Sequence, residues 1–214
     1  MSHDIRMRIL DFLAPRSCVF CGVASVGEEK SICPGCYRDL PWNEPAVSPK
    51  PGIFHRSIAM SHYSFPVDAA IKAFKFGRKL HYAPAFTEIL FASRNSLPRD
   101  IDAVLPVPLH WRRKAIRGFN QASEIAKPVA KLLNVPLVQG VHRRTATPFQ
   151  SGLAAKDRVR NLRGAFEARL KISHAHVLIV DDVITTGATM RALAKVLLSS
   201  GVAKVSSLAI ARAG

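Results

Sequence analysis

Two adjacent carboxylates, Asp181 and Asp182, precede a run of small and hydroxylated residues, Thr185 to Thr189. The run opens a segment whose apolar residues recur at helical spacing, at Ala188, Ala192, Val196 and Leu197. A helix N-terminus presents unpaired backbone N–H groups and a positive dipole end, so it binds phosphate, and Gly187 lets the backbone approach that phosphate closely. Carboxylates beside such a loop suit the diol of a ribose, with or without Mg²⁺. These residues indicate a site for a phosphorylated ribose.

The element that must position this loop is the apolar run Val177 to Val180, which is short, β-branched and uncharged. Such a run predicts a strand buried on both faces, as at the centre of a parallel sheet. The alternative is an ordinary strand–turn–helix with two solvated aspartates at its tip. The strand context and the phosphate-loop chemistry coincide over the fifteen residues from His176 to Met190, which favours the phosphate site.

The stretch from His176 to Met190 resembles the PRPP loop of the type I phosphoribosyltransferases. The resemblance implies that Asp181 and Asp182, the expected catalytic residues, face the ribose 2′- and 3′-hydroxyls. It also implies that PRPP is held with Mg²⁺ and that the loop wraps the 5′-phosphate. The implied PRPP-binding residues are Asp181, Asp182, Thr185, Thr186, Gly187, Ala188 and Thr189.

All four cysteines form two CxxC pairs, Cys18/Cys21 and Cys33/Cys36, separated by eleven residues. Each pair lies in a turn-forming sequence, and two such turns complete a closed tetrahedral Zn²⁺ site of four thiolates. A closed site supports folding and leaves no position for a substrate. Disulfides are the alternative, and the expected reducing compartment disfavours them. We expect a module of about 30 residues around the cysteines to need the metal in order to fold.

The chain of 214 residues carries 31 Lys and Arg against 15 Asp and Glu, a net charge of +16. This excess points to a polyanionic partner, nucleic acid first, although a solvated basic face without a ligand is the alternative. Between His110 and Arg163 there are twelve Lys and Arg and two acids. Three aromatic residues in or beside the basic positions, Trp111, Phe119 and Phe149, are candidate stacking rings for single-stranded DNA. The expected nucleic-acid-binding residues are Arg112, Arg113, Lys114, Arg117, Arg143, Arg144 and Arg158.

No run of 18 or more apolar residues is present, and the charged N-terminus lacks the pattern of a secretory signal, so we expect a cytoplasmic protein. The expected domains are an N-terminal helix with the four-cysteine zinc module over 1–45, a Pro-rich linker over 46–52, and an α/β domain with an open, mostly parallel sheet over 53–214. The apolar spacing from Ile5 to Leu13 predicts the first helix.

The α/β domain is predicted to contain strands at Ile58–Tyr63, Asp102–Val107, Leu137–Val141 and Val205–Ile210. Helical spacing appears from Val67 to Phe74, from Tyr82 to Leu90 and from Ala122 to Leu133, where Pro128 is expected to kink or split the helix.

Two segments are expected to border the ligand site. Residues 110–121 are predicted as a basic loop at the carboxyl end of a strand, where ligands bind in open α/β folds. The segment from Arg143 to Phe166 is predicted as a mobile loop followed by a helix from about Ala154. The AFKFG sequence around Lys75 combines aromatics with lysines; a helix face packed on the sheet is favoured over base stacking.

Nearly the whole chain resembles the ComF family. The shared features are the paired CxxC motifs, the PRPP loop, Phe74-Lys75-Phe76, Pro106-Val107-Pro108-Leu109, Arg117-Gly118-Phe119-Asn120-Gln121, and the spaced residues Thr147, Gln150, Leu153, Arg158, Asn161-Leu162 and Ala165-Phe166. The resemblance implies the type I phosphoribosyltransferase fold and a role in natural transformation, with single-stranded DNA handled in the cytoplasm. It also implies two protein partners, the competence helicase ComFA and the recombination mediator DprA.

Two functions of different class follow. The first is a DNA-handling protein that binds PRPP and single-stranded DNA. The second is a metabolic phosphoribosyltransferase that transfers 5-phosphoribosyl from PRPP to a small acceptor. A transferase needs a hood that grips the base. We expect none at the C-terminus, where four residues follow Ile210, and residues 53–99 show no obvious base-reading set. The local excess of cations favours the first function, although a pyrophosphate site itself uses two or three Arg or Lys.

Overall fold

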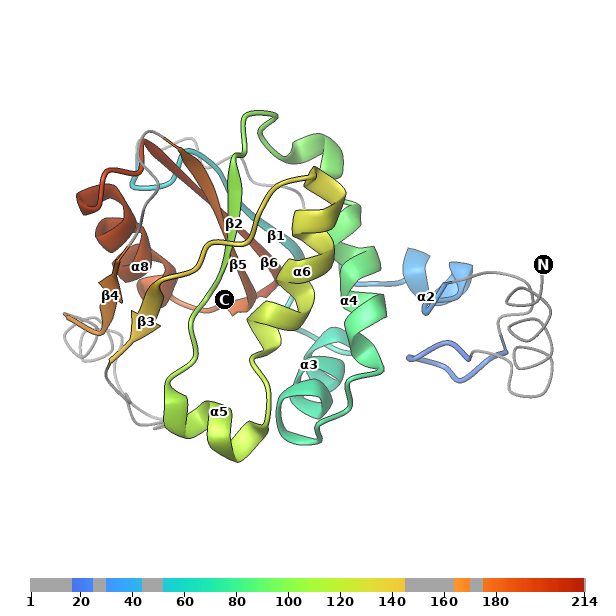
Figure 1. Ribbon diagram of the computed structural model, residues 1–214. Coiled ribbons are helices and arrows are strands. Elements are labelled where there is room, and N and C mark those ends of the chain that lie inside the picture. The colour runs from blue at the N-terminus through green and yellow to red at the C-terminus, as the bar shows by residue number, and fades with distance from the viewer. Residues whose placement is uncertain (1–16, 25–29, 44–51, 145–163, 170–174, 214) are drawn as a thin grey trace, which may run out of the picture.

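The computed structural model describes residues 17–24, 30–43, 52–144, 164–169 and 175–213. Its centre is a parallel sheet of four strands in the order β1-β6-β5-β2, as Figure 1 shows. The strands are β1 (Ser57–His62), β2 (Ala103–Pro106), β5 (His176–Ile184) and β6 (Lys204–Arg212). The predicted open parallel sheet is confirmed, and the most apolar run of the chain supplies the interior strand β5.

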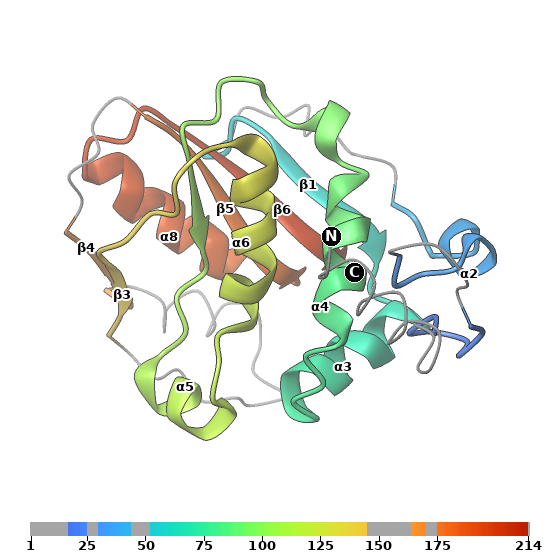
Figure 2. The ribbon, with the colours of Figure 1, turned by 45° about the vertical axis from the view of Figure 1, so that its right-hand side comes forward.

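Helices cover both faces of the sheet, so the central strands are buried on both sides (Figures 1 and 2). Leu178 and Val180 of β5 belong to the core that packs against three helices, α3 (Val67–Phe76), α4 (Tyr82–Phe91) and α6 (Gln121–Leu133). Val177 and Ile179 belong to the core under α8 (Ala188–Ser199) on the other face. This alternation is the period of two of an extended chain.

The predicted basic loop at 110–121 was wrong, because its centre is the helix α5 (Trp111–Arg117). Arginine, lysine and alanine are good helix formers, and both helix ends are capped. Nδ1 of His110 accepts a hydrogen bond from the backbone N–H of Arg112, and Gly118 ends the helix at a φ of 86°. The cations are therefore displayed on a short rigid helix.

The helix α6 continues through Pro128 from Gln121 to Leu133, so the predicted split does not occur. Proline removes one backbone hydrogen bond, but Ile125, Ala126 and Val129 on the same helix are buried against the sheet. Tertiary packing of an apolar face outweighs local propensity in such a helix.

The predicted strand from Leu137 to Val141 is reduced to a bridge, in which the N–H of Val138 donates to the carbonyl of Val104. The chain then turns at Gly140, whose φ is 83° and where a Cβ would lie 2.5 Å from the carbonyl oxygen of Arg169. After this turn β3 (Val141–Arg143) pairs antiparallel with β4 (Phe166–Ala168). The predictions for Ile5–Leu13 and for the loop and helix within 145–163 lie outside the described residues.

The N-terminal cysteine module packs directly on the sheet domain. Ile32 and Leu40 are buried in the same core as Met60 of β1. Trp42 forms an antiparallel bridge with Ser61, and the N–H of Asn43 donates to the carbonyl of Met60. The residues just before the predicted linker thus lie beside the edge strand β1.

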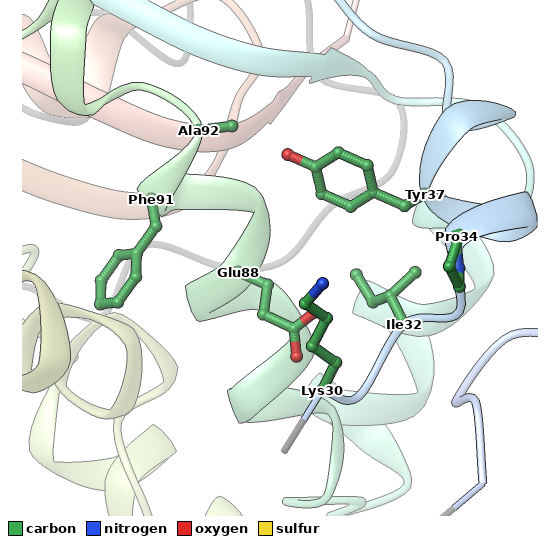
Figure 3. Close-up of a pocket in the computed structure, with 7 residues that line it drawn as sticks. All are labelled: Lys30, Ile32, Pro34, Tyr37, Glu88, Phe91 and Ala92. Carbon is green, nitrogen blue, oxygen red and sulfur yellow. The ribbon is translucent and has the colours of Figure 1, made fainter. Parts of the chain in front are cut away.

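A pocket of about 570 Å³ lies at the seam between this module and α4 (Figure 3). The carboxylate of Glu88 on α4 accepts a hydrogen bond from the backbone N–H of Ser31 at 2.5 Å, which ties the module to the helix. The pocket is lined by Lys30, Ile32, Pro34, Tyr37, Glu88, Phe91 and Ala92. None of the helices in the described parts of the chain has the length and apolar character to cross a membrane.

Candidate phosphoribosyl and nucleic-acid site

The predicted phosphate loop joins β5 to α8 at the carboxyl edge of the sheet. Gly187, the N-cap of α8, adopts a φ of 70°, and a Cβ there would lie 2.9 Å from Nη1 of Arg191. The hydroxyl of Thr186 accepts a hydrogen bond from the N–H of Ala188 at 3.3 Å, and its carbonyl accepts one from Nη2 of Arg191. The positive φ at this position therefore favours glycine. The twelve-residue helix α8 begins directly after Gly187, so its N-terminus follows the hydroxylated residues of the loop. Thr185 and Thr189 flank this turn.

The two acids lie within β5, which extends to Ile184, whereas the sequence pattern predicted them just after the strand. Asp182 is buried, and its carboxylate lies 2.9 Å from the ammonium of Lys75 on α3. The carboxylate of Asp181 accepts the backbone N–H of Asp182 at 2.9 Å. Burial and the negative charge of Asp182 raise the pKa of Asp181 to about 8, which Lys75 opposes. The acid pair therefore holds less negative charge near neutral pH than two exposed carboxylates would.

Arginines from α5 and β3 lie within electrostatic range of these acids. Burial lowers the pKa of Arg117, the charge of Asp182 raises it, and the charge of Arg113 lowers it. Burial also lowers the pKa of Arg143, as does Arg113, while Asp181 raises it. The sheet edge thus combines two acids with three arginines from two other elements. Fixed guanidinium groups of this kind bind phosphate and pyrophosphate oxygens.

His110 joins the two cationic elements. Its Nδ1 accepts the N–H of Arg112, so its Nε2 carries the proton and donates to the carbonyl oxygen of Arg144 at 3.2 Å. The ring is buried. Sequence reasoning did not single out His110, although its position directly before a run of helix formers is a capping signal.

The predicted nucleic-acid-binding residues fall into three groups. Arg112, Arg113, Lys114 and Arg117 lie together on α5. Arg143 ends β3, and the adjacent Arg144 forms an ion pair with Glu167 at 2.6 Å. Arg158 lies outside the described residues.

The predicted stacking rings also separate. Trp111 is 65% exposed, whereas the ring of Phe119 packs against the buried Phe74 with centroids 5.4 Å apart. Phe149 lies outside the described residues. The favoured packing of the AFKFG aromatics on the sheet is confirmed for Phe74, which is buried, but is wrong for Phe76, which is 61% exposed. The helical period contained the signal, because a residue two positions after the buried Phe74 must lie on a different face of α3.

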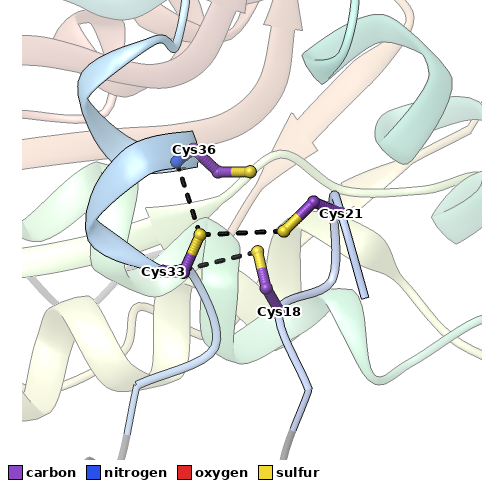
Figure 4. A group of neighbouring side chains, drawn as sticks. All are labelled: Cys18, Cys21, Cys33 and Cys36. Atoms are coloured by element: carbon purple, nitrogen blue, oxygen red, sulfur yellow. Dashed lines mark hydrogen bonds between the residues drawn. The ribbon is translucent and has the colours of Figure 1, made fainter. Parts of the chain in front are cut away.

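The four cysteine side chains converge as Figure 4 shows, and their sulfur atoms all lie within 4.8 Å of one another. The Sγ atoms of Cys21 and Cys33 are 3.7 Å apart. Four sulfurs at about 2.3 Å from one tetrahedral ion would be about 3.8 Å apart, so the geometry fits zinc. Burial opposes ionisation of Cys18, but backbone N–H groups, that of Cys33 first, lower its pKa to about 6. Burial and the neighbouring thiols raise the pKa of Cys36. These four residues form a structural zinc site.

Comparison with known proteins adds matches over both parts of the chain. Residues 119–214 match the phosphoribosyl transferase domain family and residues 9–48 match the double zinc ribbon domain family. The chain's four cysteines suffice for one site of four thiolates. The matches confirm the predicted phosphoribosyltransferase-type fold preceded by a zinc module.

Two curated relatives and one solved structure illustrate the similarity. DNA utilization protein YhgH of Salmonella typhi is 36% identical over 200 residues, which cover 88% of this chain and 86% of that protein. Competence protein F of Haemophilus influenzae is 31% identical over 167 residues, 74% of this chain and 73% of its own length. The crystal structure of an adenine phosphoribosyltransferase from Thermoanaerobacter pseudethanolicus superimposes with a TM-score of 0.38 at 20% identity, over 80% of this chain and 95% of that one.

Proposed function

This chain belongs to the ComF family, and from that premise we propose that it binds PRPP and single-stranded DNA and serves DNA uptake or utilization in the cytoplasm. The observation that carries the proposal is the composition of one sheet edge. The acid pair of β5, the phosphate loop before α8, and arginines of α5 and β3 lie at that edge. A phosphorylated sugar and a polyanion each require part of this set.

PRPP would be held by residues with distinct roles. The 5′-phosphate would accept backbone N–H groups of the turn from Thr185 to Thr189 and lie at the positive end of α8. Asp181 and Asp182 would accept the ribose hydroxyls, and Mg²⁺ would add oxygen coordination between the acids and the ligand. Arg117 or Arg143 would face the pyrophosphate. We propose binding; phosphoribosyl transfer would also need an acceptor held beside the ribose.

Single-stranded DNA would meet the cations of α5. This helix carries four Lys and Arg among seven residues and no acid, and it ends beside the acid pair. Arg117 would then serve both ligands, which predicts that PRPP and DNA weaken each other's binding. The relatives' names speak of DNA and competence, and the charge of α5 supports extending that role to this chain.

Calorimetric titration with PRPP, with and without Mg²⁺, tests the ligand assignment. At a pH above the pKa of Asp181, where both acids are ionised, the double variant Asp181→Asn, Asp182→Asn should lose about 2–4 kcal/mol of binding free energy, the value of two charge-assisted hydrogen bonds. Asp68→Asn is the matched control, because it removes a carboxylate from the opposite end of α3. Unchanged affinity in the double variant would refute the site. PRPP binding without any DNA binding would instead support a metabolic phosphoribosyltransferase.

A further inference from the structure

Exposed apolar side chains gather where the end of α3 meets α5. Among the described residues, six large hydrophobic side chains are prominently exposed, and four lie in this one place. We define the α3–α5 strip as residues 75–80 and 110–117. Its exposed apolar members are Phe76 (61%), Leu80 (49%), Trp111 (65%) and Ile116 (76%).

Two contacts join the segments of the strip into one surface. Nη2 of Arg78 donates to the carbonyl of Ile116 at 2.5 Å, and the guanidinium of Arg117 lies over the ring of Phe76, 5.3 Å from its centroid. The guanidinium of Arg112 lies over the ring of Trp111 at the same distance. Figures 1 and 2 both show α3 and α5 at the same end of the molecule. Cations thus lie directly beside both exposed rings.

The positive charge of the α3–α5 strip indicates a polyanionic partner. Residues 75–80 and 110–117 contain seven Lys and Arg and no acid. A surface of this composition repels a second copy of itself, whereas a polyanion is attracted. Exposed rings interleaved with cations suit unpaired nucleotides, because bases stack on the rings while phosphates contact the cations. Duplex DNA offers the phosphates but keeps its bases stacked within the helix.

The length of α5 suits a short run of nucleotides. Trp111 begins α5, and Arg117 at its other end holds Phe76. Six residues of helix separate these ends by about 9 Å. At a rise of about 3.4 Å per stacked nucleotide, this length accommodates two or three nucleotides.

We propose that the α3–α5 strip is a stacking platform for single-stranded nucleic acid. Unpaired bases stack on Phe76 and Trp111, and the backbone phosphates contact Arg78, Arg112 and Lys114. This inference rests on the proposed DNA binding and says where the bases lie. Stacking requires unpaired bases and therefore favours single strands, whereas contact with phosphates alone does not require unpaired bases.

The test compares ring-to-aliphatic variants in a fluorescence anisotropy titration with labelled oligothymidylate. Phe76→Leu and Trp111→Leu keep the apolar surface but remove the π face. We expect each to weaken binding by about tenfold, within the range measured for loss of base stacking. Binding of a duplex of equal length should change by less than about twofold. Phe65→Leu is the matched control, because Phe65 is 82% exposed and lies outside the strip.

Intrinsic fluorescence gives a second readout. The chain has two tryptophans, and the indole N–H of Trp42 is bonded to the carbonyl of Tyr37, whereas Trp111 is exposed. Oligothymidylate should quench the wild-type emission, and this quenching should vanish in Trp111→Leu.

Two results would overturn the inference. If the ring variants bind oligothymidylate as the wild type does, while Arg112→Ala with Lys114→Ala weakens binding, the contact is electrostatic and only the proposed DNA binding stands. If polyglutamate binds with the same dependence on both rings, the strip accepts an acidic protein segment instead. Absence of any oligonucleotide binding by the wild type would refute the proposed function itself, and the inference with it.

Discussion

The ammonium of Lys75 lies 2.9 Å from a carboxylate oxygen of Asp182, so the last turn of α3 is joined to the acid pair on β5. The pair is mostly shielded from water, with 23% of the lysine side chain and 7% of the aspartate side chain exposed. Lys75 is therefore a positioning residue for the candidate site. It stands between the buried Phe74 and the exposed Phe76, so one short segment serves the core, the acid pair and the α3–α5 strip.

Replacing Lys75 with Met should leave the Asp182 carboxylate buried without its counter-charge. Because water still reaches part of Lys75, we expect a loss of about 2 kcal/mol in the free energy of unfolding, below the value of a fully buried pair. Urea denaturation measures it. Lys72→Met is the matched control on the same helix, since its pair with Asp68 is exposed and should change stability little. Adding Asp182→Asn to Lys75→Met should restore part of the loss; additive effects of the two changes would contradict the coupling.

The affinity for Mg²⁺-PRPP should rise with pH. Burial and the charge of Asp182 raise the pKa of Asp181 to about 8, so at neutral pH this carboxyl is largely protonated. In the proposed complex, only its ionised form would accept both ribose hydrogen bonds and coordinate Mg²⁺. Calorimetry between about pH 6.5 and 9 should therefore show tighter binding at higher pH. Asp181→Asn should remove this component and keep only the titration of the ligand's phosphates, and parallel pH profiles for the two proteins would contradict the assignment.

Zinc should be present at one ion per chain in protein purified without chelator, as elemental analysis can measure. Cys33→Ser should abolish metal binding, because it removes one ligand and the Sγ atom that accepts the N–H of Cys36. The loss should lower the melting temperature of the whole domain, since Cys18 and Leu40 share a core with β1. A Cys33→Ser protein with full zinc content would show that the metal is held elsewhere.

The stability of the fold should decrease on acidification through His176. This residue is buried where β5 begins. Burial lowers its pKa, the interaction with Asp100 opposes that shift, and the charges of His55 and Lys204 add to it. The native state thus prefers the neutral ring. The contribution of His176 to the free energy of unfolding is therefore complete above the pKa of histidine in the unfolded chain, about 6.5. It is lost as the pH falls through the lower pKa of His176 in the folded protein. Denaturation between about pH 7.5 and 5 should show this slope. His176→Gln should flatten it, whereas the exposed His81→Gln should not.

Sequence patterns predicted the elements whose chemistry is local. The paired cysteines, the Thr-Gly turn and the run from Val177 to Val180 each carry their structural signal within a few residues. The tertiary partners could not be predicted in this way. Lys75 is more than a hundred positions from Asp182, and no periodicity connects them. The antiparallel pairing of β3 with β4 brings the backbone of Gly140 against that of Arg169, a contact between distant positions that spacing does not encode.

Tertiary contacts also explain why two of the predictions were wrong. Residues 110–121 were predicted as a loop because their charge suggested a ligand-binding turn, but the cap from His110 allows the arginines and lysine to form α5. Phe119 was offered as a stacking ring because it is aromatic and stands among cations, yet it packs on Phe74. Exposure decides which ring meets a ligand, and exposure depends on the tertiary fold.

The central claim is that the cations of α5 bind single-stranded DNA beside a PRPP site. The most direct test is the salt dependence of oligothymidylate affinity. Four to six phosphate contacts predict that log affinity falls against log salt with a slope of about −3 to −4. Arg112→Ala with Lys114→Ala should make the slope less steep by about 1.4, while the control Lys127→Ala with Lys131→Ala on α6 should leave it unchanged. A salt-independent interaction, or none at low ionic strength, would contradict the account.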